Sequence, residues 1–380
     1  MGGVESYFRG LVSSLQESDP VNDYCLICNS SCLESFALHS PHFTEVSCRY
    51  AKPSPMWYLR AAIRHVSRID LLRPFMNGLK VDLIHHPFSI LNPMGHRAPS
   101  VLTFHDMLHE FCPEYFSSYE IKARKALYRP SAEQASRIIA ISQHAKTCLV
   151  ERYQIDPNKI DVVYNGYSPQ FRIIDDLELR ETVRIRYGLH KPFIFYPAAT
   201  WPHKNHKRLL AALKIMKHSF GFDGQLVLSG IAMRANDAVL EEIGRLGLQD
   251  DVKVLGYLPE EDLPHLYNLA RLMVFPSLFE GFGIPLVEAM ACGCPIACSN
   301  VTSIPEVVGG SGQTFDPSSA EDMAHKVWSL WGDDALRHDS IARGLERAKQ
   351  FDWNRMARQT MAVYEKAAIT FDNAGGVSVI

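Results

Sequence analysis

The sequence predicts an α/β protein made of two doubly wound domains that follow one another along the chain. Short apolar runs alternate with longer amphipathic runs, which is the pattern of parallel strands joined by helices. The alternation is interrupted once, between Gly166 and Pro192, where Pro169 and several charged residues replace it. A chain of 380 residues is long enough for about two or three domains, so we place one domain on each side of this interruption.

The first domain is expected to span residues 1–167. Amphipathic patterns predict helices over Val4–Glu17 and Tyr119–Tyr128. Ser142 is expected to cap a further helix, because its hydroxyl can accept a hydrogen bond from an amide of the first turn. Runs of apolar and β-branched residues predict strands at Tyr24–Cys28, Val81–His85, Ser100–Phe104, Arg137–Ile141 and Asp161–Tyr164.

Residues 168–190 are expected to form a linker, residues 191–352 the second domain, residues 353–371 a last helix and residues 372–380 a tail. Strands are predicted at Phe193–Tyr196, Gln225–Leu228, Val252–Leu255, Leu272–Phe275 and Pro295–Ala297. Helices are predicted near Asn205–Lys217, Asp237–Leu246, Glu261–Ala270, Pro285–Ala291, Ala320–Trp331 and Ala335–Gln350. Such domains bind ligands at the carboxyl ends of their strands, so we expect the two domains to face each other across a cleft that holds the site.

The composition excludes several classes of protein. Lys and Arg total 39 against 42 Asp and Glu, whereas a protein devoted to nucleic-acid binding usually carries a basic excess. No apolar run reaches the roughly 18 residues of a membrane span, and the first residues lack the basic start and apolar core of a signal peptide. The nine cysteines are irregularly spaced and often lie inside apolar runs, which is typical of reduced thiols. We therefore expect a cytoplasmic protein that binds no nucleic acid.

Three cysteines, Cys25, Cys28 and Cys32, are spaced closely enough to raise the question of a zinc site. Tyr24–Cys28 is predicted to be a strand, however, and residues three apart on a strand point to opposite faces. Packed thiols are therefore favoured over zinc, and no metal site is predicted.

The most informative segment is Phe275–Met290, in which a strand is followed by a glycine turn and a helix. Glu280 precedes the turn Gly281-Phe282-Gly283, and Pro285 opens the helix, where no amide hydrogen is needed. Glycine lets a backbone approach a ligand closely, and the amides of a helix start form an anion site. With Glu288 one turn inside the helix, two acceptors flank that anion site, which suits a sugar nucleotide. The simpler interpretation, a glycine turn with two solvated glutamates, explains the strand and the proline less well.

This segment resembles the signature of retaining glycosyltransferases of family 4, which have the GT-B fold. The signature consists of a Glu, seven residues and a second Glu in a Glu-Gly-Phe-Gly-Ile-Pro context, here Glu280 and Glu288. The resemblance extends over nearly the whole chain and implies that the last helix crosses back to the first domain. Its other landmarks are Gly2–Glu5, Thr103–Asp106, Ile141-Ser142, Val163–Gly166, Pro202–Asn205, Ser303–Val308 and Phe351–Trp353.

The resemblance implies that the second domain binds a nucleotide sugar. Glu280 would be a catalytic residue that accepts hydrogen bonds from hydroxyls of the transferred sugar, Glu288 would bind the ribose, and Lys204 would bind the diphosphate. His105, which follows a strand of the first domain, would be the second catalytic residue, with Asp106 as its support; a merely structural histidine is the alternative. The other donor-binding residues implied by the resemblance are Gly2, Gly3, Phe282, Gly283 and Ile284.

Lys204 lies in a basic cluster at a predicted helix start, with Lys207 and Arg208 close behind it. A solvated basic helix start would explain the two later residues but explains Lys204, just after Pro202, less well. Many members of the family carry an Arg a few residues before this Lys, whereas this chain has Ala198–Trp201 there. The diphosphate would then depend more on Lys204 and on backbone amides.

The resemblance implies an enzyme that moves a hexose from a nucleotide-diphosphate sugar to a glycan or lipid-linked acceptor, as in cell-surface polysaccharide synthesis. The departing phosphate would take the acceptor proton, and no cofactor is expected beyond the donor itself. The context of His105 favours mannose, carried by GDP, over glucose, galactose or N-acetylglucosamine. Two alternatives stay open, namely an epimerase or hydrolase of sugar nucleotides on the same fold and a non-catalytic subunit that binds them.

The sequence gives less specific evidence about the acceptor than about the donor. Arg49–Lys80 is a basic stretch in which Arg60, Arg64 and Arg68 fall on one face of a helix and Leu59 falls on the other. Such a helix suits a peripheral contact with the inner face of an anionic membrane, although an ordinary surface helix whose apolar side faces the core is slightly favoured. His85 and His86 end a strand, where one of them would contact the acceptor or simply pack.

The beginning of the chain differs from the family pattern. A buried strand normally precedes the first glycine loop, but Gly2 and Gly3 follow Met1 directly. We therefore expect either a start codon placed at an internal Met, which we favour, or a first sheet that lacks its first strand.

Overall fold

The computed structural model describes residues 3–29, 35–49, 54–67 and 70–373 of the chain. It divides into two compact units. The N-terminal unit comprises residues up to 106, residues 118–166 and residues from 353 onward, and the C-terminal unit comprises residues 107–117 and 167–352. Each unit is described by itself.

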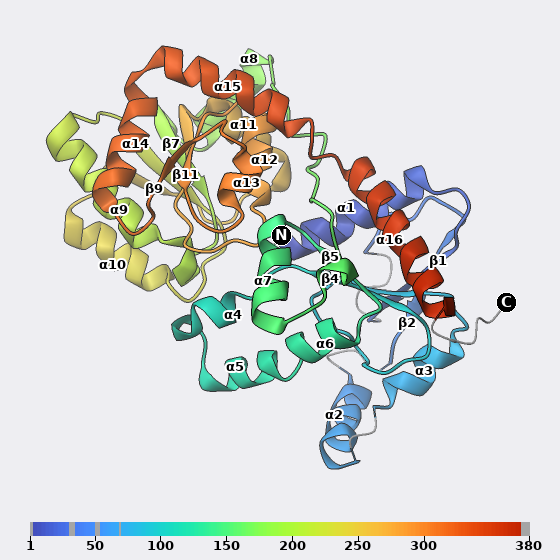
Figure 1. Ribbon diagram of the computed structural model, residues 1–380. Coiled ribbons are helices and arrows are strands. Elements are labelled where there is room, and N and C mark those ends of the chain that lie inside the picture. Colours follow the sequence, from blue (N-terminus) through green and yellow to red (C-terminus); the bar gives the residue numbers. More distant parts are fainter. Residues whose placement is uncertain (1–2, 30–34, 50–53, 68–69, 374–380) are drawn as a thin grey trace. The chain divides into compact units, whose positions relative to one another are not determined.

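The N-terminal unit is built from parallel strands and helices (Figure 1). Its strands form one sheet of order β1-β2 and a second of order β3-β4-β5-β6. The strands are β1 (Tyr24–Cys28), β2 (Phe43–Ser47), β3 (Ile84–His86), β4 (Ser100–Phe104), β5 (Arg137–Ala140) and β6 (Ile160–Val162). The helices are α1 (Gly3–Ser18), α2 (Pro55–Ser67), α3 (Leu72–Gly78), α5 (Ser118–Lys125), α6 (Tyr128–Gln134), α7 (Gln143–Tyr153) and α16 (Trp353–Asn373).

The core of this unit lies where α1 and α16 pack on each other and on β4 and β5. Strand β4 is buried at every position, including the polar Ser100 and Thr103, as expected for a strand covered on both faces. The predicted cap of α7 is confirmed, because the Ser142 hydroxyl accepts from the Ala145 amide at 3.0 Å. Among the described residues, β1 pairs only with β2 and not with the four-stranded sheet.

Several elements of this unit differ from the sequence-based expectation. The predicted helix Tyr119–Tyr128 is two helices, α5 and α6, and the strand predicted at Val81–His85 is shorter and begins at Ile84. Strand β2 and helix α3 were not predicted, because β2 is buried only at Phe43 and α3 contains Pro74.

Helix α2 corrects the expected basic face. Arg60 is only 6% exposed, and its Nε and Nη2 donate to the two carboxylate oxygens of Asp70 at 2.6 and 2.7 Å. Leu59, which was expected to face the core, is 47% exposed instead. The expectation is therefore wrong at Arg60, because a carboxylate beyond the helix binds it; Arg68 and the Arg64 side chain lie outside the described residues.

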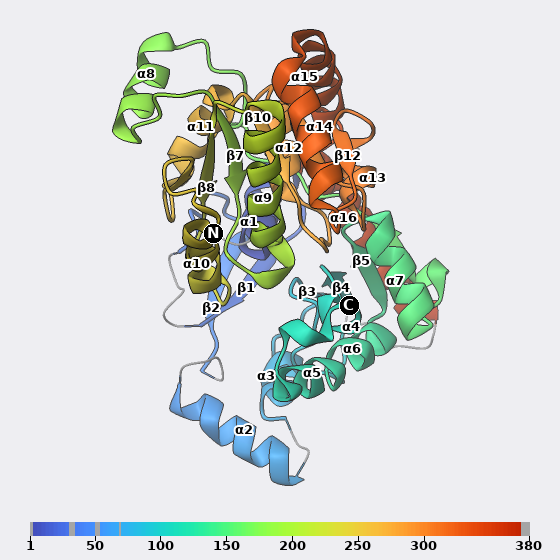
Figure 2. The same cartoon turned by 90° about the vertical axis from the view of Figure 1, so that its left-hand side faces the viewer.

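The C-terminal unit is one parallel sheet of order β12-β11-β10-β7-β8-β9 with helices on both faces (Figure 2). Its strands are β7 (Phe193–Pro197), β8 (Gln225–Ser229), β9 (Val252–Val254), β10 (Leu272–Phe275), β11 (Ile296–Ser299) and β12 (Gln313–Phe315). Its helices are α4 (Leu108–Phe111), α8 (Leu177–Arg186), α9 (His206–Ile215), α10 (Asn236–Leu246), α11 (Leu263–Leu269), α12 (Ile284–Ala291), α13 (Ile304–Val308), α14 (Ala320–Gly332) and α15 (Asp334–Ala348).

The order of the strands determines where loops meet. From β7 the chain winds outward through β8 and β9, then returns to β10 on the other side of β7, so β7 and β10 are neighbours at the centre. Leu272 pairs with Ile194 and Met273 with Phe195 in parallel register. The loops that follow these two strands, residues 198–205 and 276–283, therefore leave the same edge of the sheet together.

Helix α9 packs against α10 and α14 in one helical layer, and α8, α11, α12 and α15 pack in that order in the other. Helix α8 lies within the stretch that the sequence indicated as a linker, and it packs on α11. In the described part of the chain, no helix is both long enough and apolar enough to cross a membrane.

Candidate functional site

The loop after β7 carries Lys204 in a short 3-10 turn, Pro202–Lys204. The next residue, Asn205, has a positive φ of 63°, which ends the turn before α9 begins. The Asn205 amide donates to the carbonyl oxygens of Pro276 at 3.0 Å and Pro317 at 2.9 Å. These bonds tie the Lys204 loop to the loop that follows β10, so the register of the sheet and one asparagine together position the lysine.

Lys204 and Glu280, both predicted as site residues, are in direct contact. Lys204 Nζ donates to Glu280 Oε1 at 2.6 Å, and the two side chains are 17% and 12% exposed. The ammonium also lies 5.5 Å from the centre of the Phe275 ring. The pair therefore brings a cation and an anion together at the carboxyl ends of β7 and β10.

The glycine turn and the start of α12 lie immediately after Glu280. Gly283 has φ 101° and stands before Ile284, the first residue of α12, and Pro285 occupies the first turn as predicted. A Cβ atom on Gly283 would lie 3.0 Å from the Leu286 side chain, so a larger residue would be both strained and crowded. Phe282 and Gly283 are buried, which leaves backbone rather than side chain to meet a ligand at this helix start.

Two residues that the sequence did not identify as site residues hold this turn in place. The Ser303 hydroxyl donates to the carbonyl oxygens of Glu280 at 3.0 Å and Phe282 at 3.1 Å. The Glu280 amide donates to Thr302 Oγ1 at 3.2 Å, and Thr302 itself has a φ of 58°. Ser303 is the first residue of the landmark Ser303–Val308, but nothing in the sequence indicated that it would bind this turn.

Glu288 lies one turn inside α12, as predicted, where the Tyr267 hydroxyl donates to its Oε2 at 3.0 Å. Burial raises the pKa of the Glu288 carboxyl to about 7; the Tyr267 hydrogen bond opposes this rise and the charge of Glu260 adds to it. Near neutral pH this carboxyl is therefore balanced between its protonated and ionised forms.

His105 follows β4 in the N-terminal unit, as predicted. Its Nε2 lies 2.7 Å from the carbonyl oxygen of Pro87, and its amide donates to Ser89 Oγ at 3.0 Å. Burial lowers the pKa of His105, while the Pro87 carbonyl and Asp106 oppose that shift. Because a carbonyl can only accept, Nε2 carries the proton, and Nδ1 of the neutral ring can accept a hydrogen bond but not donate one.

A buried hydrogen-bonded chain surrounds this histidine. His85 Nδ1 lies 2.8 Å from the Tyr364 hydroxyl, and its Nε2 lies 2.8 Å from Thr103 Oγ1. The Tyr7 hydroxyl is 2.7 Å from the same Thr103 oxygen, and its ring meets the His105 ring edge-on with centroids 5.0 Å apart. Burial lowers the pKa of His85 to about 3, so this histidine is a neutral part of the core. Thr103, a polar residue inside a strand that is mostly apolar, was the feature of the sequence that could have indicated this hydrogen-bonded chain.

The remaining predicted residues are placed as follows. His86 packs against His96, with their Nε2 atoms 3.0 Å apart. Gly3 is the exposed first residue of α1, and Gly2 lies outside the described residues. The cysteines that the structure describes are free thiols, most of them buried. Within the described ranges, no group of three or more His, Cys, Asp or Glu side chains is arranged to hold a metal ion.

Comparison with known proteins assigns the chain to a family. The family model described as Glycosyltransferase Family 4 matches residues 1–171, and the model described as Glycosyl transferases group 1 matches residues 180–347. O-antigen chain mannosyltransferase B of Escherichia coli is 32% identical over 285 residues, which make up 75% of this chain and 74% of that protein.

Solved structures share the fold at lower identity. Sucrose-phosphate synthase of Thermosynechococcus elongatus is 21% identical and aligns over 96% of this chain and 93% of its own, with a TM-score of 0.76. Anabaena HepE in complex with UDP-glucose is 20% identical and aligns over 96% of both chains, with a TM-score of 0.74. The predicted family and fold are thus confirmed, and the chain belongs to the glycosyltransferases of family 4 with the GT-B fold.

Proposed function

We propose that this glycosyltransferase moves a hexose, with mannose favoured, from a nucleotide-diphosphate sugar to a glycan or lipid-linked acceptor, with retention of configuration at the anomeric carbon. The contact between Lys204 Nζ and Glu280 Oε1 at 2.6 Å carries the proposal. A nucleotide sugar joins a phosphate to a sugar through a single oxygen. It therefore needs a cation for the phosphate and an acceptor for sugar hydroxyls side by side, which is what this pair offers.

Groups next to the Lys204–Glu280 pair suit the remaining parts of the donor, namely its diphosphate and its ribose. The amides at the start of α12, around Gly283, suit the diphosphate, because a helix start favours negative charge. Glu288 lies one turn further into the helix, where an ionised carboxylate would accept from both ribose hydroxyls. The order sugar, diphosphate, ribose would then follow Glu280, the helix start and Glu288.

The chemistry that these residues support is stabilisation of the leaving group. The bond between the anomeric carbon and the phosphate oxygen breaks, and a bond to the acceptor oxygen forms on the same face. The acceptor proton passes to the departing phosphate oxygen. A cation about 4 Å from the developing charge contributes on the order of 4 kcal/mol at an effective dielectric of 20, and Lys204 is proposed to supply it. Glu280 would stabilise the sugar through its hydroxyls rather than attack it.

His105 is proposed to assist by accepting a hydrogen bond from the sugar through Nδ1. Its neutral ring, with Nε2 held by the Pro87 carbonyl at 2.7 Å, supports a positioning contact and argues against a role as proton donor. No cofactor beyond the donor enters this proposal.

The preference for mannose is supported by the Escherichia coli relative, which is described as an O-antigen chain mannosyltransferase. The Anabaena structure with UDP-glucose, by contrast, supports the fold alone at 20% identity. A thermal-shift screen with GDP-mannose, UDP-glucose, UDP-galactose and UDP-N-acetylglucosamine would decide. A ligand at one hundred times its Kd adds about 2.7 kcal/mol to the stability of the folded state, so the true donor should give the largest shift.

Substitutions in the pair test the assignment. We expect Lys204→Ala and Glu280→Ala each to abolish transfer, and Glu280→Gln to reduce it at least about hundredfold while keeping the shape of the side chain. Lys207→Ala, which removes an exposed cation one turn away, is the matched control and should stay active. Full activity in a folded Lys204 or Glu280 variant would refute the proposal.

The same enzyme preparation separates the alternatives. Incubating the donor without an acceptor should leave it largely intact if the enzyme is a transferase. Epimerised or hydrolysed donor under those conditions would indicate an epimerase or hydrolase. Donor binding with no turnover across an acceptor panel would indicate a non-catalytic subunit.

A peripheral membrane contact at the inner face is proposed for the case of a lipid-linked acceptor. Helix α2 is the part of the N-terminal unit that suits this contact, because Tyr58 is 62% and Leu59 47% exposed. Sedimentation with vesicles containing phosphatidylserine should show binding that falls in Tyr58→Ser and Leu59→Ser. If the unmodified protein does not bind the vesicles, the proposed membrane contact is wrong and a soluble glycan is the acceptor that fits.

A further inference from the structure

A cavity of about 490 Å³ lies in the C-terminal unit, away from the Lys204–Glu280 pair. Its lining includes Phe193, the first residue of β7, as well as Arg271 and Pro295, which stand just before β10 and β11. The Lys204 and Glu280 loops leave the carboxyl ends of β7 and β10, so the cavity is at the opposite, amino edge of the same sheet. Five residues of β7 span about 16 Å at 3.3 Å per residue, which separates the two places.

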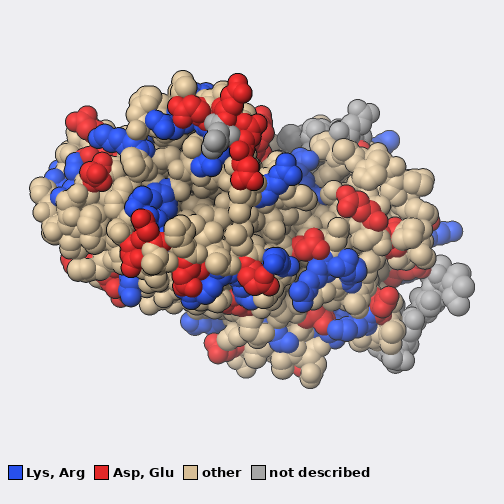
Figure 3. Space-filling model, turned by 90° about the horizontal axis from the view of Figure 1, so that it is seen from above, with Lys and Arg blue, Asp and Glu red and all other residues tan. Residues whose placement is uncertain are grey.

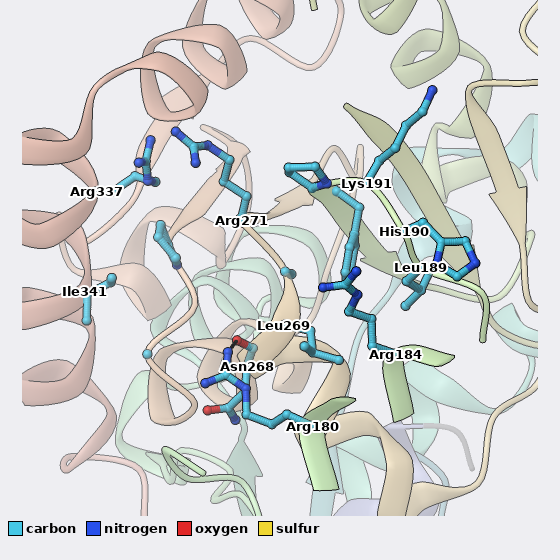
Figure 4. A pocket seen from close by; sticks show the side chains of 15 residues that line it. Arg180, Arg184, Leu189, His190, Lys191, Asn268, Leu269, Arg271, Arg337 and Ile341 are labelled. Atoms are coloured by element: carbon cyan, nitrogen blue, oxygen red, sulfur yellow. Dashed lines mark hydrogen bonds between the residues drawn. The ribbon is translucent and has the colours of Figure 1, made fainter. Parts of the chain in front are cut away.

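The lining of this cavity is basic. Arg180 and Arg184 come from α8, Arg271 precedes β10, and Arg337 comes from α15, so distant segments of the chain bring guanidinium groups to one place. Figure 4 shows Arg271 and Arg337 together on one side of the pocket and the two arginines of α8 across from them. None of the residues that line it is Asp or Glu. On the face shown in Figure 3, by contrast, basic and acidic side chains are interspersed.

Backbone carbonyl groups hold three of these arginines without neutralising them. Arg180 Nη2 donates to the Asn268 carbonyl oxygen at 2.8 Å. Arg271 Nε and Arg337 Nη1 donate to the same carbonyl oxygen, that of Trp331, at 2.9 and 2.8 Å. A carbonyl oxygen fixes a guanidinium in place but leaves its full positive charge, so the site is built for an anion in position as well as in charge.

Two carboxylates lie beside the cavity and do not balance it. Asp334 contacts both Arg271, at 3.5 Å, and Arg337, but its side chain is 72% exposed. Glu181 is 3.5 Å from Arg184 and is 52% exposed. Burial lowers the pKa of Arg337, and the nearby charge of Arg271 lowers it further, which reflects cations held close together.

The two arginines of α8 also have donors without acceptors. The Nε atoms of Arg180 and Arg184 are buried, and neither has a hydrogen-bond partner among the described residues. Buried donors in proteins are normally satisfied, so unsatisfied donors at the wall of a basic cavity indicate that an acceptor from outside the chain fits there. A guanidinium binds phosphate oxygens through paired N–H groups, whereas it gains little from a neutral ligand.

We propose that this cavity is a binding site for a small phosphorylated molecule, separate from the donor site and independent of the function proposed above. Its volume is typical of a site for a small molecule. An occupant would bridge α8 and α15. It would also contact the segment that precedes α8, because Asn268 at the cavity wall binds the backbone of Arg172 and Ile174 at 2.9 Å each. The competing explanation is that the arginines only cap the carboxyl ends of α11 and α14, which a cation favours.

Arg184 separates these two explanations. Arg184 forms an ion pair with the exposed Glu181 and does not cap a helix end, so Arg184→Gln leaves the capping intact while removing charge from the cavity. Isothermal titration with inorganic pyrophosphate should therefore show at least tenfold weaker binding in Arg184→Gln. Arg358→Gln removes an exposed cation of α16 and is the control that should bind like the unmodified protein. Arg271→Lys, which keeps the charge but not the paired N–H groups, should weaken binding as well.

The titration is run in the Lys204→Ala background, so that pyrophosphate at the donor site does not contribute. Binding that survives there and falls in Arg184→Gln supports the proposal. The proposal is overturned if the Lys204→Ala protein binds no pyrophosphate, if Arg184→Gln binds unchanged, or if Arg358→Gln loses as much. Sedimentation with phosphatidylserine vesicles completes the test, because vesicle binding that depends on Arg184 without pyrophosphate binding would assign the cavity to a membrane surface instead.

Discussion

Protonated Glu288 favours the stability of the fold, whereas the proposed ribose contact needs the ionised form. The substitution Glu288→Gln tests both effects. Burial raises the pKa of this carboxyl from 4.5 to about 7. Glutamine has nearly the same shape and its amide oxygen can still accept from the Tyr267 hydroxyl, 3.0 Å away, but it does not ionise. The variant therefore removes the charge while leaving the packing of α12 in place.

The sign of the effect follows from the direction of the shift. The folded protein holds the Glu288 proton more tightly than the unfolded chain, so its stabilising contribution is complete below pH 4.5 and is lost as the pH rises through 7. At about 1.4 kcal/mol for each pH unit between the two values, ionising Glu288 costs about 3 kcal/mol at pH 8. At pH 5 the cost is below about 1 kcal/mol, because the carboxyl is still protonated in the folded state.

Urea unfolding of both proteins from pH 5 to pH 8 gives the test. Relative to the unmodified protein, Glu288→Gln should gain about 2.5 kcal/mol of unfolding free energy between pH 5 and pH 8. Glu241→Gln, which removes an exposed carboxylate of α10, is the matched control. A Glu288→Gln difference that is equal at pH 5 and pH 8 would refute the reasoning.

The functional half of this prediction concerns the nucleotide. If the ionised carboxylate binds the ribose, donor affinity in the unmodified protein should rise about tenfold from pH 6 to pH 8, as the ionised fraction rises from about 0.1 to about 0.9. Glu288→Gln should bind more weakly and show a flat profile over this range. Isothermal titration with the best donor of the nucleotide-sugar screen measures both, and a variant that binds as tightly as the unmodified protein at pH 8 contradicts the ribose assignment.

Contacts of single residues lead to three further predictions. Ser142→Ala removes the cap of α7 and should lower the unfolding free energy by about 1 kcal/mol, whereas Ser142→Asp should retain most of it; equal urea midpoints would contradict this. Asp70→Asn leaves the buried guanidinium of Arg60 without its counter-charge and should cost about 3–5 kcal/mol by chemical unfolding, with Asp70→Leu combined with Arg60→Met recovering much of the loss. Gly230 has φ 138°, and a Cβ there would lie 2.5 Å from the backbone after β7, so Gly230→Ala should displace the start of the Lys204 loop and weaken donor binding, while Gly244→Ala on α10 should be neutral in a donor-binding assay.

The fold is most predictable where strands are buried on both faces. Leu272–Phe275 was predicted to the residue, because a central parallel strand that is covered on both faces is apolar at every position. Ser100–Phe104 was also predicted to the residue, although Ser100 and Thr103 interrupt its apolar run. Strand β2 buries only Phe43 among five residues, so its sequence, Phe-Thr-Glu-Val-Ser, resembles a loop. Its pairing with β1 supplies what the local pattern lacks, and pairing between distant segments does not appear in a window of sequence.

In the candidate site, the residues proposed to contact the ligand could be predicted from the sequence, whereas the contacts of the residues that hold them in place could not. The resemblance to the family's motifs indicated Lys204 and Glu280, whose residue types suit a phosphate and sugar hydroxyls. Asn205 and Ser303 support these residues through bonds to backbone carbonyl groups that come together only when the sheet forms. Both residues lie in landmarks of the family resemblance, but a hydroxyl or an amide that binds a carbonyl has no characteristic neighbour in the sequence, so their supporting role is found from coordinates.

The charge balance illustrates how an average over the chain conceals a local site. A net charge of -3 argued against a protein with a basic surface, yet four arginines line one cavity whose lining includes no carboxylate. The sequence did not indicate an anion site at Arg180 and Arg184, because they lie in a polar stretch that was expected to be a linker. They become neighbours of Arg271 and Arg337 only because α8 packs on α11, beside the amino ends of β10 and β11. Composition therefore excludes a class of partner for the whole surface, but a cavity formed by segments far apart in the sequence can still bind an anion.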